Sequence, residues 1–204
     1  RCNTVLDHLE GAAIDTAVKS RVRGQASFLR AFYYFNLVRC FGDIPLVTHE
    51  VSSTTEAFSL AARKPAADIY TQIIADAQAA AGALPDAWTD PKDKGRAVKA
   101  SAQTLLADVY LTLKQYPNAI PLLRAVMQSP NGYTLLADYA GLYTIAGENS
   151  AESIFEIQYK EGTATDVGGE YLHRRLDKES YKQGIIADIS QVGGYPEYKG
   201  TPYK

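Results

Sequence analysis

Cysteine and histidine are scarce in this sequence, and their positions argue against the common metal and redox sites. The two cysteines, Cys2 and Cys40, form no closely spaced CxxC pair. The three histidines, His8, His49 and His173, are isolated from one another. Zinc sites and thioredoxin-type sites both need closely spaced ligands or thiols. We therefore expect no metal, no redox centre and no cofactor, and we interpret Cys40, inside an apolar helical run, as a small buried residue.

An excess of positive charge and a long hydrophobic run are also missing. The sequence has 21 Lys and Arg against 23 Asp and Glu, a formal net charge of -2, which argues against a nucleic-acid partner. No run reaches the roughly 18 apolar residues that a membrane-spanning helix needs. The sequence begins without methionine, in a segment that already has helical spacing. We therefore expect a piece of a longer protein whose targeting signal lies outside this chain.

The motifs of the common enzyme classes do not occur either. There is no GxSxG elbow, no GxxxxGK phosphate loop, no HExxH and no EF-hand pattern. Acidic residues are plentiful, and a glycosidase needs only two of them at the right separation, but the sequence cannot locate such a pair. We predict that the protein is not an enzyme and that it binds its ligand without chemistry.

Helical periodicity dominates what is present. Residues 3–10 have the spacing of the end of a helix, and a second helix is predicted from Asp15 or Thr16 to Phe41, with Gly42 as its stop. Within it, Phe32, Tyr33, Tyr34 and Phe35 stand in succession, and apolar residues cover nearly all faces. Such a helix is typical of one packed on several sides, so we interpret these aromatics as core and not as a ligand-stacking surface.

A repeat of paired helices is predicted further along the chain. Segment 96–115 and segment 117–129 form two helices joined by a short turn at Tyr116 and Pro117. With Ala107 as the small residue of a tetratricopeptide repeat, the other consensus offsets carry Leu106, Tyr110, Ala119 and Leu123, with Pro130 near the terminal proline. The earlier pair of helices, 15–41 and 65–83, is interpreted as a second unit with an insertion, 48–63, between its members.

The pattern changes after residue 131. We expect a short helix at 137–143 and a strand at 153–159, where Phe155, Ile157 and Tyr159 alternate with polar or smaller residues. Beyond Lys160 glycine and tyrosine are frequent and no period is visible. The fold class is therefore mostly α: a helical-repeat scaffold over 1–159, with minor β, followed by an irregular loop-rich segment, 160–204.

Five segments in order along the chain form a recognisable set. They are NTVLDHLE (3–10), RGQASFLRAFYYFNLVRCFGDIPLV (23–47), IYTQIIADAQAAAGALP (69–85), GRAVKASAQTLLADVYLTLKQYPNAIPLLRAVMQS (95–129) and YAGLYTIAGENSAESIFEIQY (139–159). Taken together, they resemble the SusD/RagB family of surface nutrient-binding lipoproteins of Bacteroidetes. Family members are about twice as long, so the resemblance implies that the chain is truncated at both ends and that a complete ligand site need not lie within it.

The resemblance implies a function as well as a fold. Members of the family have a tetratricopeptide-like helical scaffold with a less regular region that contributes to the ligand site. They are held by an N-terminal lipid anchor, here outside the chain, on the extracellular face of the outer membrane. They deliver oligosaccharides, or in some members peptides, to a SusC-like TonB-dependent transporter.

Aromatic residues in loops are the candidate ligand-binding residues. Sugar rings present apolar C–H faces that stack on flat side chains, and such side chains must be exposed on a rigid scaffold. This criterion selects Trp88, in the polar loop 86–95, and three tyrosines of the tail, Tyr171, Tyr195 and Tyr198. Trp88 has two interpretations: it folds back over the core near Leu84, or it is displayed for a ligand.

Two other functions stay open at this point. The first is a helical-repeat scaffold that binds a protein or peptide, and this function does not require Trp88. A carbohydrate hydrolase would release products from an oligosaccharide, and neither the motifs nor the resemblance supports it.

Overall fold

The computed structural model describes residues 1–93, 95–143, 147 and 149–158. The chain separates into two compact units, Arg1–Glu156 and Ile157–Lys204. All helices and strands below belong to the first unit. The predicted loop-rich segment 160–204, with Tyr171, Tyr195 and Tyr198, lies outside the described residues, so the domain boundary at 159 stays a prediction.

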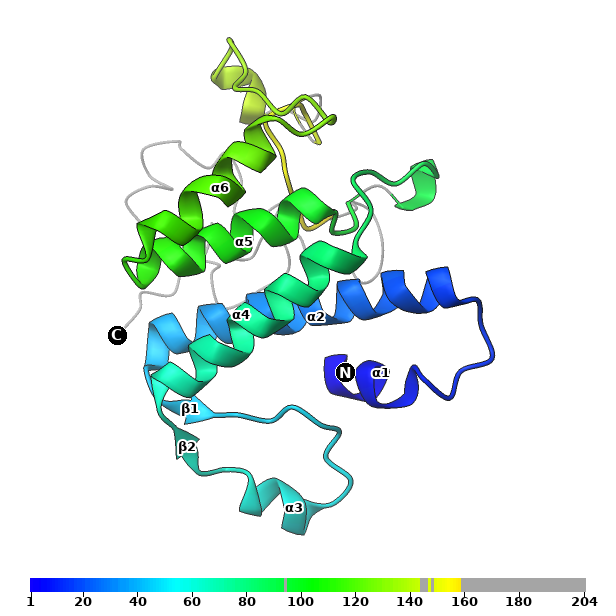
Figure 1. Cartoon of the computed structure of the whole chain (residues 1–204), viewed down its shortest axis with the longest axis vertical. Coiled ribbons are helices and arrows are strands. Elements are labelled where there is room, and N and C mark those ends of the chain that lie inside the picture. Colours follow the sequence, from blue (N-terminus) through cyan, green and yellow to red (C-terminus); the bar gives the residue numbers. More distant parts are fainter. Residues whose placement is uncertain (94, 144–146, 148, 159–204) are drawn as a thin grey trace, which may run out of the picture. The chain divides into compact units, whose positions relative to one another are not determined.

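Four long helices follow one another as a stack in the first unit (Figure 1). They are α2 (Thr16–Phe41), α4 (Ala66–Ala83), α5 (Lys99–Thr112) and α6 (Tyr116–Met127). Helix α4 packs on α2, α5 on α4, and α6 on α5. The short α1 (Cys2–His8) lies beside α2, and the 3-10 turns η1 (Pro91–Asp93) and η2 (Ala140–Tyr143) lie in loops. This order confirms both predicted helix pairs.

The insertion between α2 and α4 holds a small ribbon and one more short helix, α3 (Thr54–Ser59). Strands β1 (Ile44–Pro45) and β2 (Arg63–Lys64) pair antiparallel, with Ile44 opposite Lys64. Because β1 follows α2 directly and β2 directly precedes α4, the ribbon brings the end of one helix to the start of the next (Figure 1). It also makes the fold mostly α with minor β, as predicted.

Local signals determine where α2 begins and ends. The Asp15 carboxylate accepts hydrogen bonds from the backbone N–H groups of Ala17 and Val18, which would otherwise lack partners. Gly42 ends the helix with φ at 64°, a conformation that glycine adopts without strain. The cap and the stop stand where the sequence predicts them.

The core lies between α2, α4 and α5, where small residues let the helices approach. Ala31, Ala77 and Ala102 are fully buried, and Phe28, Phe35, Ile69 and Ile73 fill the space around them. Interiors are close-packed, so each of these positions admits little change in volume. Gly24 of α2 belongs to this contact, because a Cβ there would lie 3.0 Å from Cγ of Leu84.

Helix α2 is buried on one face only, which corrects the expectation of packing on several sides. Phe28, Phe35 and Val38 are buried, whereas Tyr33 is 57% exposed and Phe41 is 62% exposed. The reason is that α2 is the first helix of the stack. Cys40, predicted to be buried, is also exposed for this reason.

The tetratricopeptide positions show the same effect at the other end of the stack. Leu106, Ala107 and Ala119 are buried, as their offsets predict, but Leu123 is 36% exposed. It lies on the outer face of α6 with three more exposed side chains, Tyr116, Ile120 and Met127. Helix α6 is the last of the described stack, so this apolar face has no helix against it among the described residues.

The predicted strand at 153–159 is wrong over its described part. Residues 153–158 have irregular backbone, and the short helix predicted at 137–143 is the 3-10 turn η2. Ser101 donates a hydrogen bond to the Ile154 carbonyl, and Phe155 packs edge-on against Phe28. Burial does not alternate along the segment either: residues 153–156 are all half-buried, and Ile157, on the same side of the predicted strand as Phe155, is 56% exposed. A ladder also needs a neighbouring strand, and none pairs with it in the described part of the chain.

Candidate functional site

Trp88 lies in the loop between α4 and α5, and the structure combines both interpretations of it. Its indole Nε1–H donates to the Ala97 carbonyl at 3.0 Å, and its ring packs against the buried side chains around α5. The Arg96 guanidinium carbon lies 5.9 Å from the ring centroid. Trp88 is therefore folded back and anchored, yet it keeps part of its surface exposed.

The exposed part of Trp88 lines an open pocket of about 510 Å³, which we call the Trp88 pocket. Its walls come from the loop before α5, from the turn after α6 and from segment 149–156. Hydroxyl, amide and charged groups surround the indole: Asp90, Asp93, Arg96, Asn131, Tyr133, Asn149, Ser153 and Glu156. A pocket of this size, with one aromatic wall and several polar groups, has the composition of a small-molecule site.

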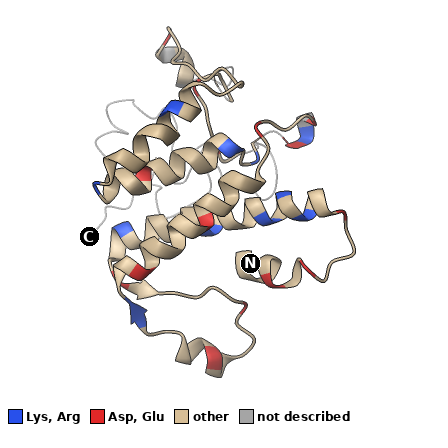
Figure 2. Cartoon of the chain, viewed as in Figure 1, with Lys and Arg blue, Asp and Glu red and all other residues tan. Residues whose placement is uncertain are grey.

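The polar side chains of the Trp88 pocket are held in place by the protein. Asn131 donates to the Asp86 carbonyl at 2.6 Å and to the Tyr133 hydroxyl at 3.0 Å. Asp93 pairs with Arg96 at 2.6 Å, and Arg96 also donates to the Gln25 amide oxygen at 3.1 Å. These groups present donors and acceptors in fixed positions, which a ligand rich in hydroxyl groups requires. The loop carries charges of both signs (Figure 2).

A second cavity of about 430 Å³ shares residues 150 and 153–156 with the Trp88 pocket as lining. Its floor is apolar, formed by Phe28, Phe32, Leu105 and Phe155. The Thr104 hydroxyl is buried here without a hydrogen-bond partner among the described residues. The sequence gives no signal for this cavity, because its walls come from four separate segments.

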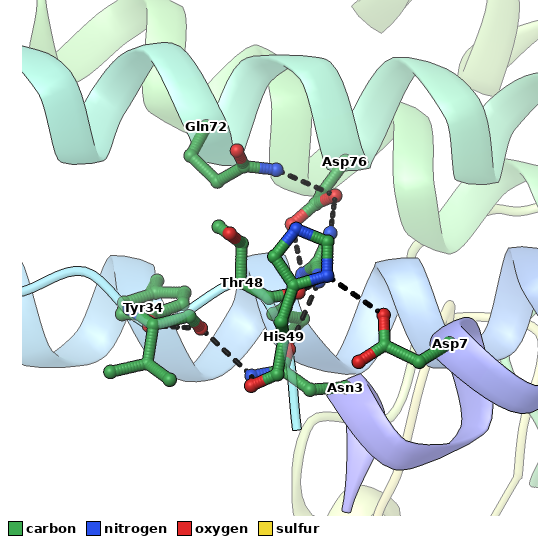
Figure 3. Close-up of polar contacts among 9 residues, drawn as sticks. Asn3, Asp7, Tyr34, Thr48, His49, Gln72 and Asp76 are labelled. Atoms are coloured by element: carbon green, nitrogen blue, oxygen red, sulfur yellow. Dashed lines mark hydrogen bonds and ion pairs between the residues drawn. The ribbon is translucent and has the colours of Figure 1, made fainter. Parts of the chain in front are cut away.

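A buried ion pair that sequence reasoning missed joins α2 to α4 (Figure 3). Arg30 binds both Asp76 oxygens at 2.8 Å, and the Gln72 amide donates to the same carboxylate at 3.0 Å. The remaining Arg30 nitrogen donates to the Asn3 side chain at 3.0 Å and to the Thr48 carbonyl at 2.9 Å. The guanidinium thus connects α1, α2, α4 and the segment after β1.

The electrostatics of this network are those of a structural site. Burial disfavours the charge on Arg30, but the hydrogen bonds and the charge of Asp76 outweigh it and raise the Arg30 pKa. Both partners are saturated with protein contacts, so the network offers no free group for a ligand. The sequence signal that could have indicated this ion pair is Asp76 itself, a charged residue in the middle of an otherwise apolar helix segment, since buried charges are rare unless they are paired.

Two histidine–carboxylate contacts attach α1 to the segment after β1. His8 lies 2.7 Å from Glu50, and His49 lies 3.0 Å from Asp7 (the second pair is drawn in Figure 3). The Glu50 backbone N–H and the His49 ring lower the Asp7 pKa, and hydrogen bonds from His8 and Thr4 lower the Glu50 pKa. These pairs are exposed and hold α1 in place.

No group of three or more His, Cys, Asp and Glu side chains in the described part of the chain is arranged to hold a metal ion. Within the same residues, every helix is too short or too polar to cross a membrane.

The stack of antiparallel helix pairs defines a tetratricopeptide-like helical-repeat protein with an aromatic-lined pocket at a loop (Figure 1). Residues 1–111 match the family model described as "Starch-binding associating with outer membrane". The chain belongs to this SusD-like family.

Individual relatives agree with the family match. "SusD-like protein P2" of Formosa agariphila is 34% identical over 177 residues, which are 85% of this chain and 32% of that protein. A solved "Laminarin binding SusD-like protein" is 32% identical with a TM-score of 0.71, over 78% of this chain and 35% of that one. "Surface glycan-binding protein A" of Bacteroides thetaiotaomicron, solved with laminarihexaose, is 26% identical with a TM-score of 0.67, over 78% and 32%. The chain spans about a third of the length of these relatives.

Proposed function

We propose that the protein captures oligosaccharides on the extracellular face of the outer membrane and delivers them to a SusC-like TonB-dependent transporter, without catalysing a reaction. An N-terminal lipid anchor outside this chain would attach it to the membrane. Family membership supports this proposal. Two structural relatives support it as well: one is named for laminarin binding, and the other was solved in complex with laminarihexaose.

The geometry of Trp88 is the main structural support. Its hydrogen bond to Ala97 and its packing fix the indole, so a ligand meets a preformed surface and loses little to ordering of the side chain. Around it, Asn131, Tyr133 and Asp90 line the same pocket and supply groups that bond hydroxyls. An apolar plane surrounded by polar groups is complementary to a pyranose ring, which has C–H faces and a hydroxyl rim.

Trp88 is proposed as one ligand-binding residue among several. Tyr171, Tyr195 and Tyr198 remain predictions of the same kind from the segment 160–204.

Substitutions of Trp88 test the stacking role by calorimetry on the intact protein, with laminarihexaose and maltohexaose as first ligands. Trp88→Leu keeps an apolar side chain but removes the aromatic plane, and we expect it to weaken binding about tenfold, the upper range of one aromatic contact. Trp88→Phe keeps a plane and should lose only a few-fold.

The matched control is Phe58→Leu, the same loss of an aromatic plane at a side chain of α3 that is 82% exposed and outside the pocket. It should leave affinity unchanged. Thermal melting of each variant identifies any that is merely unfolded. Equal affinity of Trp88→Leu and the wild-type protein would contradict the role of Trp88.

The transporter partner is tested separately, by purifying the tagged protein from membranes and identifying what accompanies it. A barrel of the SusC type should co-purify in stoichiometric amount. The alternative function, a scaffold that binds a protein or peptide, would be favoured if no glycan in a broad panel binds and if peptide binding is insensitive to Trp88→Leu.

A further inference from the structure

The charges around the Trp88 pocket are unequal in sign. Among its described lining residues, Asp90, Asp93 and Glu156 are acidic and Arg96 is basic. Asparagine, tyrosine, serine and threonine side chains supply the remaining polar groups among the described lining residues. Among the described residues of the lining, a ligand that enters therefore meets three carboxylates and one guanidinium.

The one guanidinium is already engaged by the protein. Arg96 Nε lies 2.6 Å from the Asp93 carboxylate, and an Arg96 terminal nitrogen donates to Gln25 at 3.1 Å. The fork geometry that makes arginine a good receptor for a ligand carboxylate or sulfate is thus directed at Asp93. An anionic ligand group would have to displace Asp93 and leave that carboxylate without its cation.

Two of the acidic groups accept hydrogen bonds from the backbone. Asp90 accepts a hydrogen bond from the Lys92 backbone N–H at 2.9 Å, and Glu156 accepts from the Asn149 backbone N–H at 3.0 Å. Each carboxylate can still accept hydrogen bonds from sugar hydroxyls, whereas it repels a ligand carboxylate or sulfate.

We infer that the Trp88 pocket selects uncharged glycans and rejects glycans that carry carboxylate or sulfate groups. This inference rests on the proposed function, because it specifies the class of oligosaccharide bound at the same site. The charge of the lining, and not the stacking surface, provides the discrimination, since an indole stacks equally on the ring of a neutral or an acidic sugar.

The test compares two ligands that differ only at C6 of each sugar ring, and the salt dependence isolates the contribution of charge. Laminarihexaose and its derivative with the C6 hydroxymethyl groups oxidised to carboxylates have the same linkages, ring and length. Calorimetry on the intact protein at about 20 mM ionic strength, where screening is weak, should show the oxidised ligand binding at least about tenfold more weakly. At about 0.5 M salt, where the Debye length falls to about 4 Å, the difference should shrink several-fold.

A substitution with a matched control assigns the effect to the pocket. Asp93→Asn removes one negative charge and releases Arg96 from its ion pair. It should therefore reduce the ratio of the two ligands' affinities at least about threefold. Asp68→Asn removes the same charge from the exposed first turn of α4, outside the pocket, and should leave the difference unchanged.

The possible results separate the two proposals. Equal or tighter binding of the oxidised ligand would overturn the charge inference and leave glycan capture standing. A difference that Asp93→Asn and Asp68→Asn alter alike would also overturn it, because the selectivity would then come from overall charge. Failure of both ligands, and of a panel of other neutral and acidic oligosaccharides, would overturn the proposed function itself.

Discussion

Replacing Asp76 by Asn should destabilise the protein far more than any comparable surface change. The Arg30 and Asp76 side chains are only 12% and 6% exposed, and two hydrogen bonds of 2.8 Å join them. An asparagine has the same shape but places an NH2 group where one carboxylate oxygen was. If its oxygen still accepts hydrogen bonds from the Gln72 amide and from the terminal Arg30 nitrogen, its NH2 group faces Arg30 Nε–H. Two donors then point at each other and neither finds an acceptor.

The magnitude follows from what remains around the guanidinium. Asp76→Asn leaves Arg30 charged, with only neutral acceptors: the Asn3 side chain, the Thr48 carbonyl and the amide oxygen of the new side chain. Removing one partner of a buried pair costs about 3–5 kcal/mol, and the surviving bonds to these neutral acceptors place this case near 3 kcal/mol. Arg30→Met should cost a similar amount, since it leaves the Asp76 carboxylate with Gln72 alone.

The double variant Arg30→Met/Asp76→Leu separates the cost of losing the whole ion pair from the cost of leaving one buried charge without its partner. Because both charges are gone and water can reach the half-buried Asn3 and Thr48, we expect a loss of only about 1–2 kcal/mol from the wild-type stability. Urea denaturation followed by circular dichroism gives these free energies by linear extrapolation. The control is Asp108→Asn, which breaks the exposed Arg39–Asp108 contact at 3.9 Å and should cost less than about 1 kcal/mol. If Asp76→Asn costs no more than Asp108→Asn, the reasoning about desolvation is refuted.

Further outcomes concern packing and pH. Gly24→Ala should lower the free energy of unfolding by up to about 2 kcal/mol, because the new Cβ would lie 3.0 Å from Leu84 and overpacking outweighs the gain in helix propensity. Gly82→Ala, where a new Cβ meets nothing within 4 Å, should raise the free energy of unfolding by about 0.5–1 kcal/mol, and equal effects of the two substitutions in thermal melts would contradict this reasoning. The carboxylates of Asp7 and Glu50 have pKa values below their ordinary 3.8 and 4.5, so their contribution is complete above those values and is lost as pH falls through the lowered pKa. Hydrogen-exchange protection of α1, corrected for intrinsic rates, should therefore fall as the pH drops from about 5 to about 3, and constant protection over that range would sink the prediction.

Local signals were sufficient for the four long helices of this fold, but they did not indicate the short α3 within the insertion 48–63. The Asp15 cap, the Gly42 stop and the apolar period determine α2 from nearby residues alone, and Pro85 and the turn before Pro117 limit the next helices in the same way. The strand predicted at 153–159 failed because strand formation depends on a partner that may lie anywhere in the chain. Residues 153–158 are held by the Ser101 hydroxyl and the Phe28 ring instead.

The candidate site was predictable only in part. A lone tryptophan in a polar loop drew attention to Trp88, but its hydrogen bond to Ala97 and its neighbours Asn131 and Glu156 come from segments 9 or more residues away. Distance along the chain gives no indication of such contacts.

The sequence by itself determined the helical class, the repeat pairs and the family, because periodicity, caps and motif order are properties of neighbouring residues. Tertiary structure decided which faces are buried. All four residues of the run Phe32–Phe35 are aromatic, so the sequence does not distinguish them. Phe35 is nevertheless buried and Tyr33 exposed, because only one side of α2 meets the next helix. Tertiary structure likewise decided that Arg30 meets Asp76 and that Arg96 turns to Asp93 beside Trp88, because long side chains find partners only after the helices and loops are placed.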